Sequence, residues 1–103
     1  MKYRIQRTDR AGDQLDRLLM YIADDAGDID VALRYLDRIE EAIMRLSEFP
    51  YAGAAPRYSI LKKQGYRVLI VEKQLVFYKV DEKERLVTIY AVVDGRMEYR
   101  NLI

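Results

Sequence analysis

The hydrophobic positions in the last third of the chain fall into three short runs that are split by charged residues. The runs cover residues 65–71, 75–80 and 86–93, and they are rich in Val, Ile, Leu, Phe and Tyr. Glu72-Lys73-Gln74 separates the first two runs, and a five-residue charged segment, 81–85, separates the last two. Runs of this length and composition are typical of strands. The pattern predicts a three-stranded antiparallel meander.

The first half of the chain has a helical period instead. Residues 2–6 alternate between polar and apolar, which suits a short strand with one buried face, and apolar residues then recur every three or four positions. Thr8 or Asp9 is suited to cap a first helix, and Asp28 or Asp30 to start a second. The apolar stripes are Ala11, Leu15, Leu18, Leu19 and Ile22, then Ala32, Tyr35, Leu36, Ile39, Ala42, Ile43 and Leu46. With about five residues between the stripes, the pattern predicts an antiparallel helical hairpin.

A loop separates this hairpin from the meander. Residues 50–57 contain two prolines and a glycine and show no periodicity. We expect Tyr58–Leu61 to form a short extended piece and Lys62-Lys63-Gln64 to form a basic turn. The expected fold is α+β, a single domain over residues 1–103 with the element order β-α-α-β-β-β and the helices on one face of the sheet.

Both faces of the predicted meander are partly apolar. Strict alternation in the last strand places Val87, Ile89, Ala91 and Val93 on one face and Thr88, Tyr90 and Val92 on the other. A helical hairpin covers only one face of such a sheet. The other face then needs the C-terminal tail, a second copy or a partner to cover it. Half-exposed tyrosines with a purely structural role are the alternative.

Composition excludes several kinds of chemistry. The chain contains no Cys and no His, which rules out thiolate metal sites, cysteine nucleophiles and histidine bases. Its acidic residues do not follow metal-ligand spacing and it has no phosphate-binding glycine loop, so we expect no metal and no cofactor. The net charge is +1, but residues 1–49 carry 8 basic and 11 acidic side chains, whereas residues 50–103 carry 10 and 6. The strand-rich half is therefore better suited to meet a polyanion.

The N-terminus lacks the apolar run of a signal peptide, and no segment approaches the roughly 20 apolar residues of a membrane span. We therefore expect a cytoplasmic protein with no membrane partner.

Two arginines are the candidate functional groups of the meander. Arg67 lies near the start of its first strand, and Arg96 follows Gly95 at the end of its last. If the meander brings them together, paired guanidinium groups can bind a phosphate and stabilise the charge of a phosphoryl transition state. Ion pairs with Glu72 or Asp94 are the structural alternative for these arginines.

The order of several short motifs resembles the toxins of the RelE/ParE superfamily, from bacterial type II toxin–antitoxin (plasmid stabilisation) modules. The motifs are Tyr21-Ile22, Tyr35-Leu36, residues 39–43 with Leu46, Pro50 with Gly53, Gly65-Tyr66-Arg67, Val76-Phe77-Tyr78 and Gly95-Arg96 near Leu102. The resemblance covers nearly the whole chain. It implies a compact α+β toxin that inhibits growth when it is free of a cognate antitoxin, which wraps it.

The resemblance leaves the cellular target open. RelE-like members cut mRNA on the ribosome, whereas ParE-like members inhibit DNA gyrase and catalyse no reaction. The long hairpin and the nearly neutral charge favour a ParE-like gyrase inhibitor, because each phosphate contact of an RNA-binding protein needs positive charge. The alternatives are a metal-independent mRNA endoribonuclease and a degenerate toxin that only binds its antitoxin. The sequence also leaves open whether the toxin forms a homodimer in the absence of antitoxin.

For the nuclease alternative, the resemblance assigns roles to five residues. Arg67 and Arg96 match the two family arginines and are assigned to catalysis. Lys62 and Lys63 are the candidates for the basic residues that bind substrate. Tyr99 loosely matches the terminal acid/base residue, but an unperturbed tyrosine titrates near about pH 10 and is a poor base at neutral pH without a cationic neighbour. These departures weigh against nuclease activity.

Overall fold

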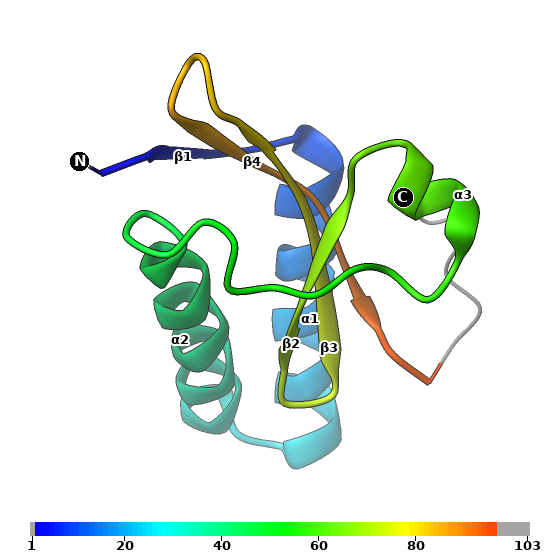
Figure 1. Cartoon of the computed structure of the whole chain (residues 1–103). Coiled ribbons are helices and arrows are strands. Elements are labelled where there is room, and N and C mark those ends of the chain that lie inside the picture. Colours follow the sequence, from blue (N-terminus) through cyan, green and yellow to red (C-terminus); the bar gives the residue numbers. More distant parts are fainter. Residues whose placement is uncertain (1, 97–103) are drawn as a thin grey trace.

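A four-stranded sheet forms the centre of the computed structural model, which describes residues 2–96 (Figure 1). Its strands are β1 (Arg4–Arg7), β2 (Arg67–Val71), β3 (Gln74–Asp81) and β4 (Leu86–Asp94), in the spatial order β1-β4-β3-β2. β2, β3 and β4 form the predicted antiparallel meander. β1 pairs in parallel with β4, so the sheet is mixed.

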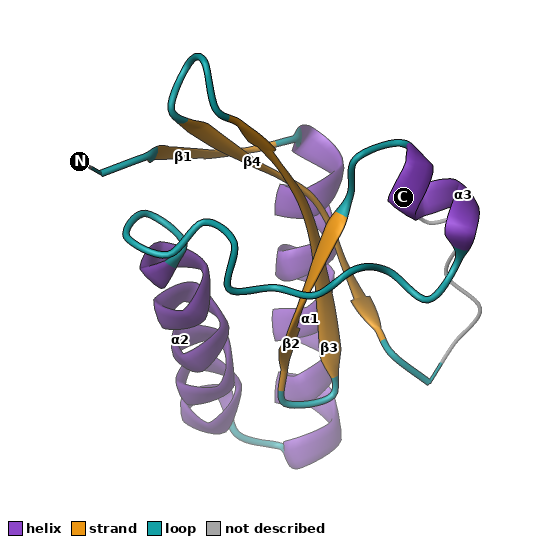
Figure 2. Cartoon of the chain, in the orientation of Figure 1, coloured by secondary structure: helices purple, strands orange, loops and turns teal. Residues whose placement is uncertain are grey.

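Two long helices, α1 (Asp9–Ala26) and α2 (Ile29–Arg45), form the predicted hairpin on one face of the sheet (Figure 2). Both begin at residues that the sequence suggested as caps. The Thr8 hydroxyl accepts a hydrogen bond from the Ala11 N–H at 3.1 Å, and the Asp28 carboxylate accepts one from the Asp30 N–H at 2.9 Å. Within residues 2–96, neither of these helices nor any other has the combined length and apolar character needed to cross a bilayer.

The connection between the helices is shorter than expected. Only Gly27 and Asp28 join them, because α1 continues through the acidic residues 24–25 beyond the end of its apolar stripe. Gly27 ends α1 with a φ of 66°, in the left-handed region that favours glycine. The two helices therefore leave the turn side by side.

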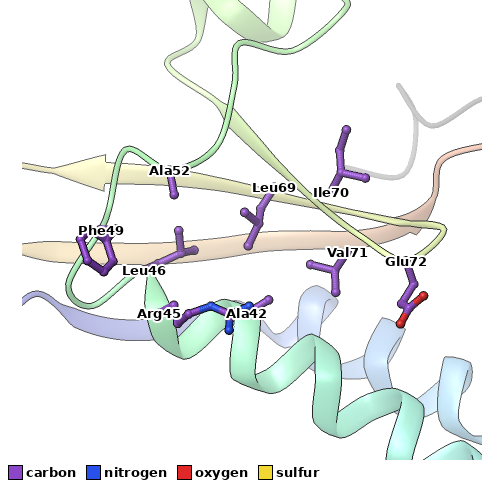
Figure 3. Close-up of a pocket in the computed structure, with 9 residues that line it drawn as sticks. All are labelled: Ala42, Arg45, Leu46, Phe49, Ala52, Leu69, Ile70, Val71 and Glu72. Carbon is purple, nitrogen blue, oxygen red and sulfur yellow. The ribbon is translucent and has the colours of Figure 1, made fainter.

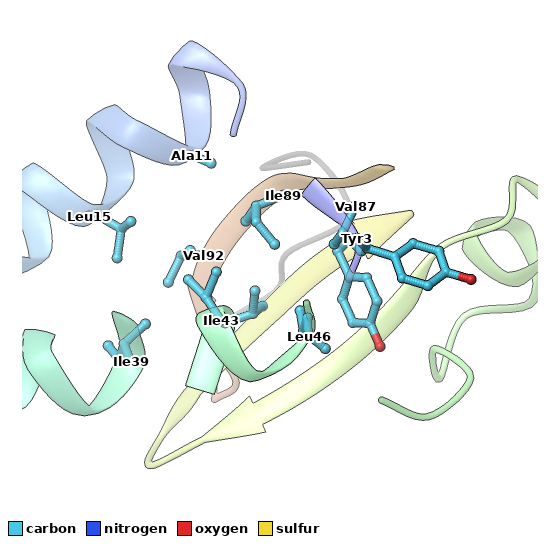
Figure 4. Close-up of a cluster of buried hydrophobic side chains, with 11 residues drawn as sticks. Tyr3, Ala11, Leu15, Ile39, Ile43, Leu46, Val87, Ile89 and Val92 are labelled. Carbon is cyan, nitrogen blue, oxygen red and sulfur yellow. The ribbon is translucent and has the colours of Figure 1, made fainter. Parts of the chain in front are cut away.

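The main core lies between the hairpin and the sheet (Figure 4). Its buried members are Tyr3, Ala11, Leu15, Ile39, Ile43, Leu46, Val76, Tyr78, Val87, Ile89 and Val92. Both predicted helical stripes thus contribute their buried faces. Each large aliphatic side chain buried here contributes about 1.5–3 kcal/mol relative to an exposed one.

A short helix, α3 (Ser59–Lys63), lies on the opposite face of the sheet. The extended piece predicted for Tyr58–Leu61 is therefore wrong. The two helices of the hairpin share one face of the sheet, as predicted. Leu61 of α3 packs in a second buried cluster with Val68, Phe77, Ala91 and Val93. Five residues are too few to show a helical period, and burial of Leu61 stabilises the turn. Part of the second apolar face is thus covered by the chain itself.

A β-bulge alters which residues of β4 face the hairpin. Tyr78 pairs with Ile89, and the pairing resumes at Ala91, so Tyr90 is one extra residue. Ile89 and Val92 therefore join the main core, whereas Ala91 joins the second cluster. The strict alternation predicted for this strand holds up to Ile89 and is wrong beyond it.

Candidate functional site

Arg67 anchors the loop that follows the hairpin. Its Nη2 donates hydrogen bonds to the carbonyl oxygens of Gly53 at 2.5 Å and Tyr51 at 3.0 Å, and its guanidinium lies 5.2 Å from the centre of the Tyr51 ring. The Tyr51 hydroxyl in turn donates to the Glu82 carboxylate, a hydrogen bond that raises the pKa of Tyr51 to about 12. Arg67 is thus engaged inside the fold, and its contacts differ from the predicted ion pairs with Glu72 or Asp94.

Arg96 is held by Asp94, two residues before it. Its Nε and Nη2 donate to the two carboxylate oxygens at 3.0 and 2.7 Å, and its backbone N–H donates to Oδ1 at 2.8 Å. These hydrogen bonds lower the pKa of Asp94 to about 2, and those from the Arg96 side chain make the largest contribution. The side-chain hydrogen bonds also raise the pKa of Arg96. This ion pair is the structural alternative that the sequence suggested for Arg96.

The two arginines lie apart in the meander. Arg67 pairs with Tyr78 near the middle of β3, whereas Asp94 pairs with Gln74 at the start of β3. Four residue steps along β3 separate these two positions, about 13 Å at ~3.3 Å per residue. β2 and β4 both run antiparallel to β3, so the start of β2 and the end of β4 must lie apart. The expectation that the meander brings the two guanidinium groups together is therefore wrong.

The remaining sequence candidates are placed as follows. Lys62 and Lys63 form the exposed last turn of α3, on the sheet face opposite the hairpin. Tyr99 lies outside the described residues. Across residues 2–96, no three acidic side chains are grouped so that they could hold a metal ion.

A groove of about 350 Å³ runs between α2 and the outer edge of β2 (Figure 3). Its lining residues are Ala42, Arg45, Leu46, Phe49, Ala52, Leu69, Ile70, Val71 and Glu72. In Figure 3, Leu69 and Val71 lie on the α2 side of the strand, and Ile70 points away from the helix. Ile70 is 71% exposed and Phe49 is 62% exposed. Most of the lining residues are therefore apolar, and the Phe49 and Ile70 side chains are accessible to a partner.

The backbone edge beside this groove is partly free. The N–H and C=O of Val68 bond to Ala54 across the outer edge of β2 at 2.9 and 2.8 Å. Because these groups alternate in direction along a strand, those of Ile70 point to the same outer side. No backbone or side chain among residues 2–96 hydrogen-bonds to Ile70 at that edge. An exposed apolar side chain on a free strand edge suits a partner that adds a strand. The sequence showed Ile70 only as one more strand residue, so it did not reveal this site.

Comparison with known proteins decides the family. The family model described as the ParE toxin of the type II toxin–antitoxin system parDE matches residues 5–99. The chain belongs to the ParE toxin family. A curated relative, Toxin ParE3 of Caulobacter vibrioides, is 33% identical over 94 residues, which cover 91% of this chain and 88% of the relative. The predicted superfamily and the preference for its ParE side are confirmed.

Two solved structures share the fold of this ParE-family chain. A chain of the chromosomal ParDE toxin–antitoxin system from P. aeruginosa aligns with a TM-score of 0.74 at 18% identity, covering 90% of this chain and 96% of that one. A chain of the RelBE2 toxin–antitoxin complex from Mycobacterium tuberculosis aligns with a TM-score of 0.67 at 19% identity, covering 91% and 92%. Both neighbours come from toxin–antitoxin systems.

Proposed function

We propose that this ParE-family protein inhibits growth by binding DNA gyrase, without catalysing a reaction of its own. The separation of Arg67 and Arg96 is the observation that supports this mechanism over RNA cleavage. Each arginine is bound to groups of its own chain, and the two lie apart, Arg67 beside the middle of β3 and Arg96 beyond the start of β3. A metal-independent nuclease needs cationic groups that converge on one phosphate and a base beside them. The chain has no histidine to act as that base.

The α2–β2 groove is the surface that we propose for the antitoxin. An extended apolar antitoxin segment can pair with the free backbone of Ile70 and insert side chains beside Leu46 and Leu69. Burial of the exposed Phe49 and Ile70 side chains favours such a complex. A free toxin would retain these exposed groups, which also promote self-association into a homodimer. A gyrase target implies a cytoplasmic location.

A supercoiling assay with purified DNA gyrase tests this function. The proposal predicts that the toxin inhibits gyrase and that an equimolar amount of cognate antitoxin restores activity. Cleavage of mRNA in a translating extract, with gyrase unaffected, would contradict the proposal and support the endoribonuclease instead. Antitoxin binding with neither activity would identify a degenerate toxin.

A further inference from the structure

The connected end of the helical hairpin, here called the hairpin tip (residues 20–33), carries large exposed apolar side chains. They are Met20, Tyr21, Ile29, Val31 and Leu33. Met20 is 58% exposed and Tyr21 is 67% exposed. The two-residue connection keeps the ends of both helices together at one end of the molecule, as Figure 1 shows. Met and Tyr are among the residues that are enriched at protein interfaces.

The hairpin tip is also uniformly acidic. Asp24, Asp25, Asp28 and Asp30 are all exposed, and the segment contains no Lys or Arg. Among the ion pairs formed within residues 2–96, none includes any of these four carboxylates. The exposed apolar side chains are therefore accompanied by negative charge that the described fold does not neutralise.

Two of these charges oppose the stability of their own helix. Asp24 and Asp25 lie in the last turn of α1, which has no basic residue. The C-terminal end of a helix carries partial negative charge, so carboxylates there are locally unfavourable. Asp28 differs because its side chain caps α2. Charged residues that destabilise their own helix, and that form no compensating contact inside the fold, are expected at functional surfaces.

We propose that the hairpin tip docks on the basic, DNA-binding surface of the target enzyme, an inference that rests on the proposed gyrase function. An enzyme that binds DNA neutralises phosphates with Lys and Arg, so its DNA-binding surface is positively charged. The four carboxylates of the tip are complementary to such a surface and accelerate the encounter. Met20, Tyr21 and Ile29 then supply the apolar contacts that hold the complex.

The charge is tested by binding kinetics on the purified, intact gyrase complex. The double variant Asp24→Asn/Asp25→Asn should associate about tenfold more slowly at low salt, and should depend less on salt than the wild type. The matched control Asp13→Asn/Asp16→Asn removes the same charge from exposed positions nearer the start of α1. This control should associate like the wild type. Duplex DNA added as a competitor should slow association of the wild type.

The apolar contacts are tested with Tyr21→Ala. Because Tyr21 is largely exposed, this variant should keep the wild-type circular dichroism spectrum and melting temperature while its Kd for gyrase rises about 30-fold. Gyrase binding by both tip variants at wild-type rates and affinity would overturn the tip proposal and leave the proposed function standing. If the tip variants instead lose antitoxin binding, the antitoxin occupies the hairpin tip, and the tip proposal is overturned as well. If the wild type does not bind gyrase at all, the proposed function fails and the tip proposal fails with it.

Discussion

The backbone N–H of Gly53 donates a hydrogen bond to the Tyr78 hydroxyl at 2.9 Å, which ties the loop after α2 to the middle of the sheet. Tyr78 has no exposed surface, so its hydroxyl depends on a partner inside the protein. A β carbon at position 53 would lie 2.6 Å from the carbonyl oxygen of Val68 and 2.7 Å from the Tyr78 hydroxyl. The loop can therefore approach the sheet this closely only at a glycine.

Gly53→Ala should lower the free energy of unfolding by about 1–3 kcal/mol, because the added methyl group must displace the loop or the buried tyrosine. Urea unfolding measures the change. Gly12→Ala is the matched control, since a β carbon there would meet nothing closer than Arg7 Cδ at 4.0 Å. Within helix α1, that substitution should raise stability by roughly 0.5–1 kcal/mol. Equal effects of the two substitutions would contradict the close approach at Gly53.

The Asp94–Arg96 pair predicts that the stability of the protein falls slightly at acidic pH. Its hydrogen bonds lower the pKa of Asp94 from 3.8 to about 2, so their contribution to stability is present above pH 3.8 and is lost as the pH falls through 2. The effect on stability is small, because the Arg96 side chain is 68% exposed. In Arg96→Ala the pKa of Asp94 should rise towards its ordinary value of 3.8 but stay below it, because the backbone N–H of residue 96 still donates a hydrogen bond. NMR titration of the carboxyl group measures this, and Arg38→Ala, which removes a different ion pair, should leave the Asp94 pKa unchanged.

Ile70→Lys should weaken antitoxin binding about 30-fold, because it places a charge on the free strand edge that borders the groove, where the antitoxin would bury an apolar side chain. Isothermal titration calorimetry with the cognate antitoxin measures the loss. The stability of the free toxin should change by less than about 0.5 kcal/mol, because Ile70 is 71% exposed. Ile60→Lys, on α3 and 59% exposed, makes the same chemical change outside the groove and should bind normally. Equal antitoxin binding by the two variants would exclude the groove as the antitoxin-binding surface.

The hairpin and the meander could be predicted because each long element repeats its own period many times. The apolar stripes of residues 9–26 and 29–45 recur over several turns, and tertiary packing agrees with them. The short elements could not be predicted in this way. Helix α3 has five residues, and the bulge at Tyr90 depends on how β4 pairs with β3 rather than on its own sequence.

The site was harder to predict than the fold, because its contacts join residues far apart in sequence. Arg38 pairs with Glu72 at 2.6 Å and links α2 to the turn between β2 and β3, whereas Glu40 pairs with Arg7 at 2.8 Å and links α2 to β1. The separation of Arg67 and Arg96, by contrast, follows from the direction of three antiparallel strands alone. That geometry was available from the sequence.

Brief induction of the toxin in cells that lack its antitoxin tests the central claim most directly, with an SOS reporter and a genome-wide map of new mRNA 5′ ends read from the same culture. Gyrase inhibition predicts an SOS response without new 5′ ends. It also predicts that Arg96→Ala leaves this response intact, because Arg96 pairs with Asp94 and takes no part in catalysis. New 5′ ends inside translated codons, lost in Arg96→Ala, would contradict the account and establish the ribonuclease.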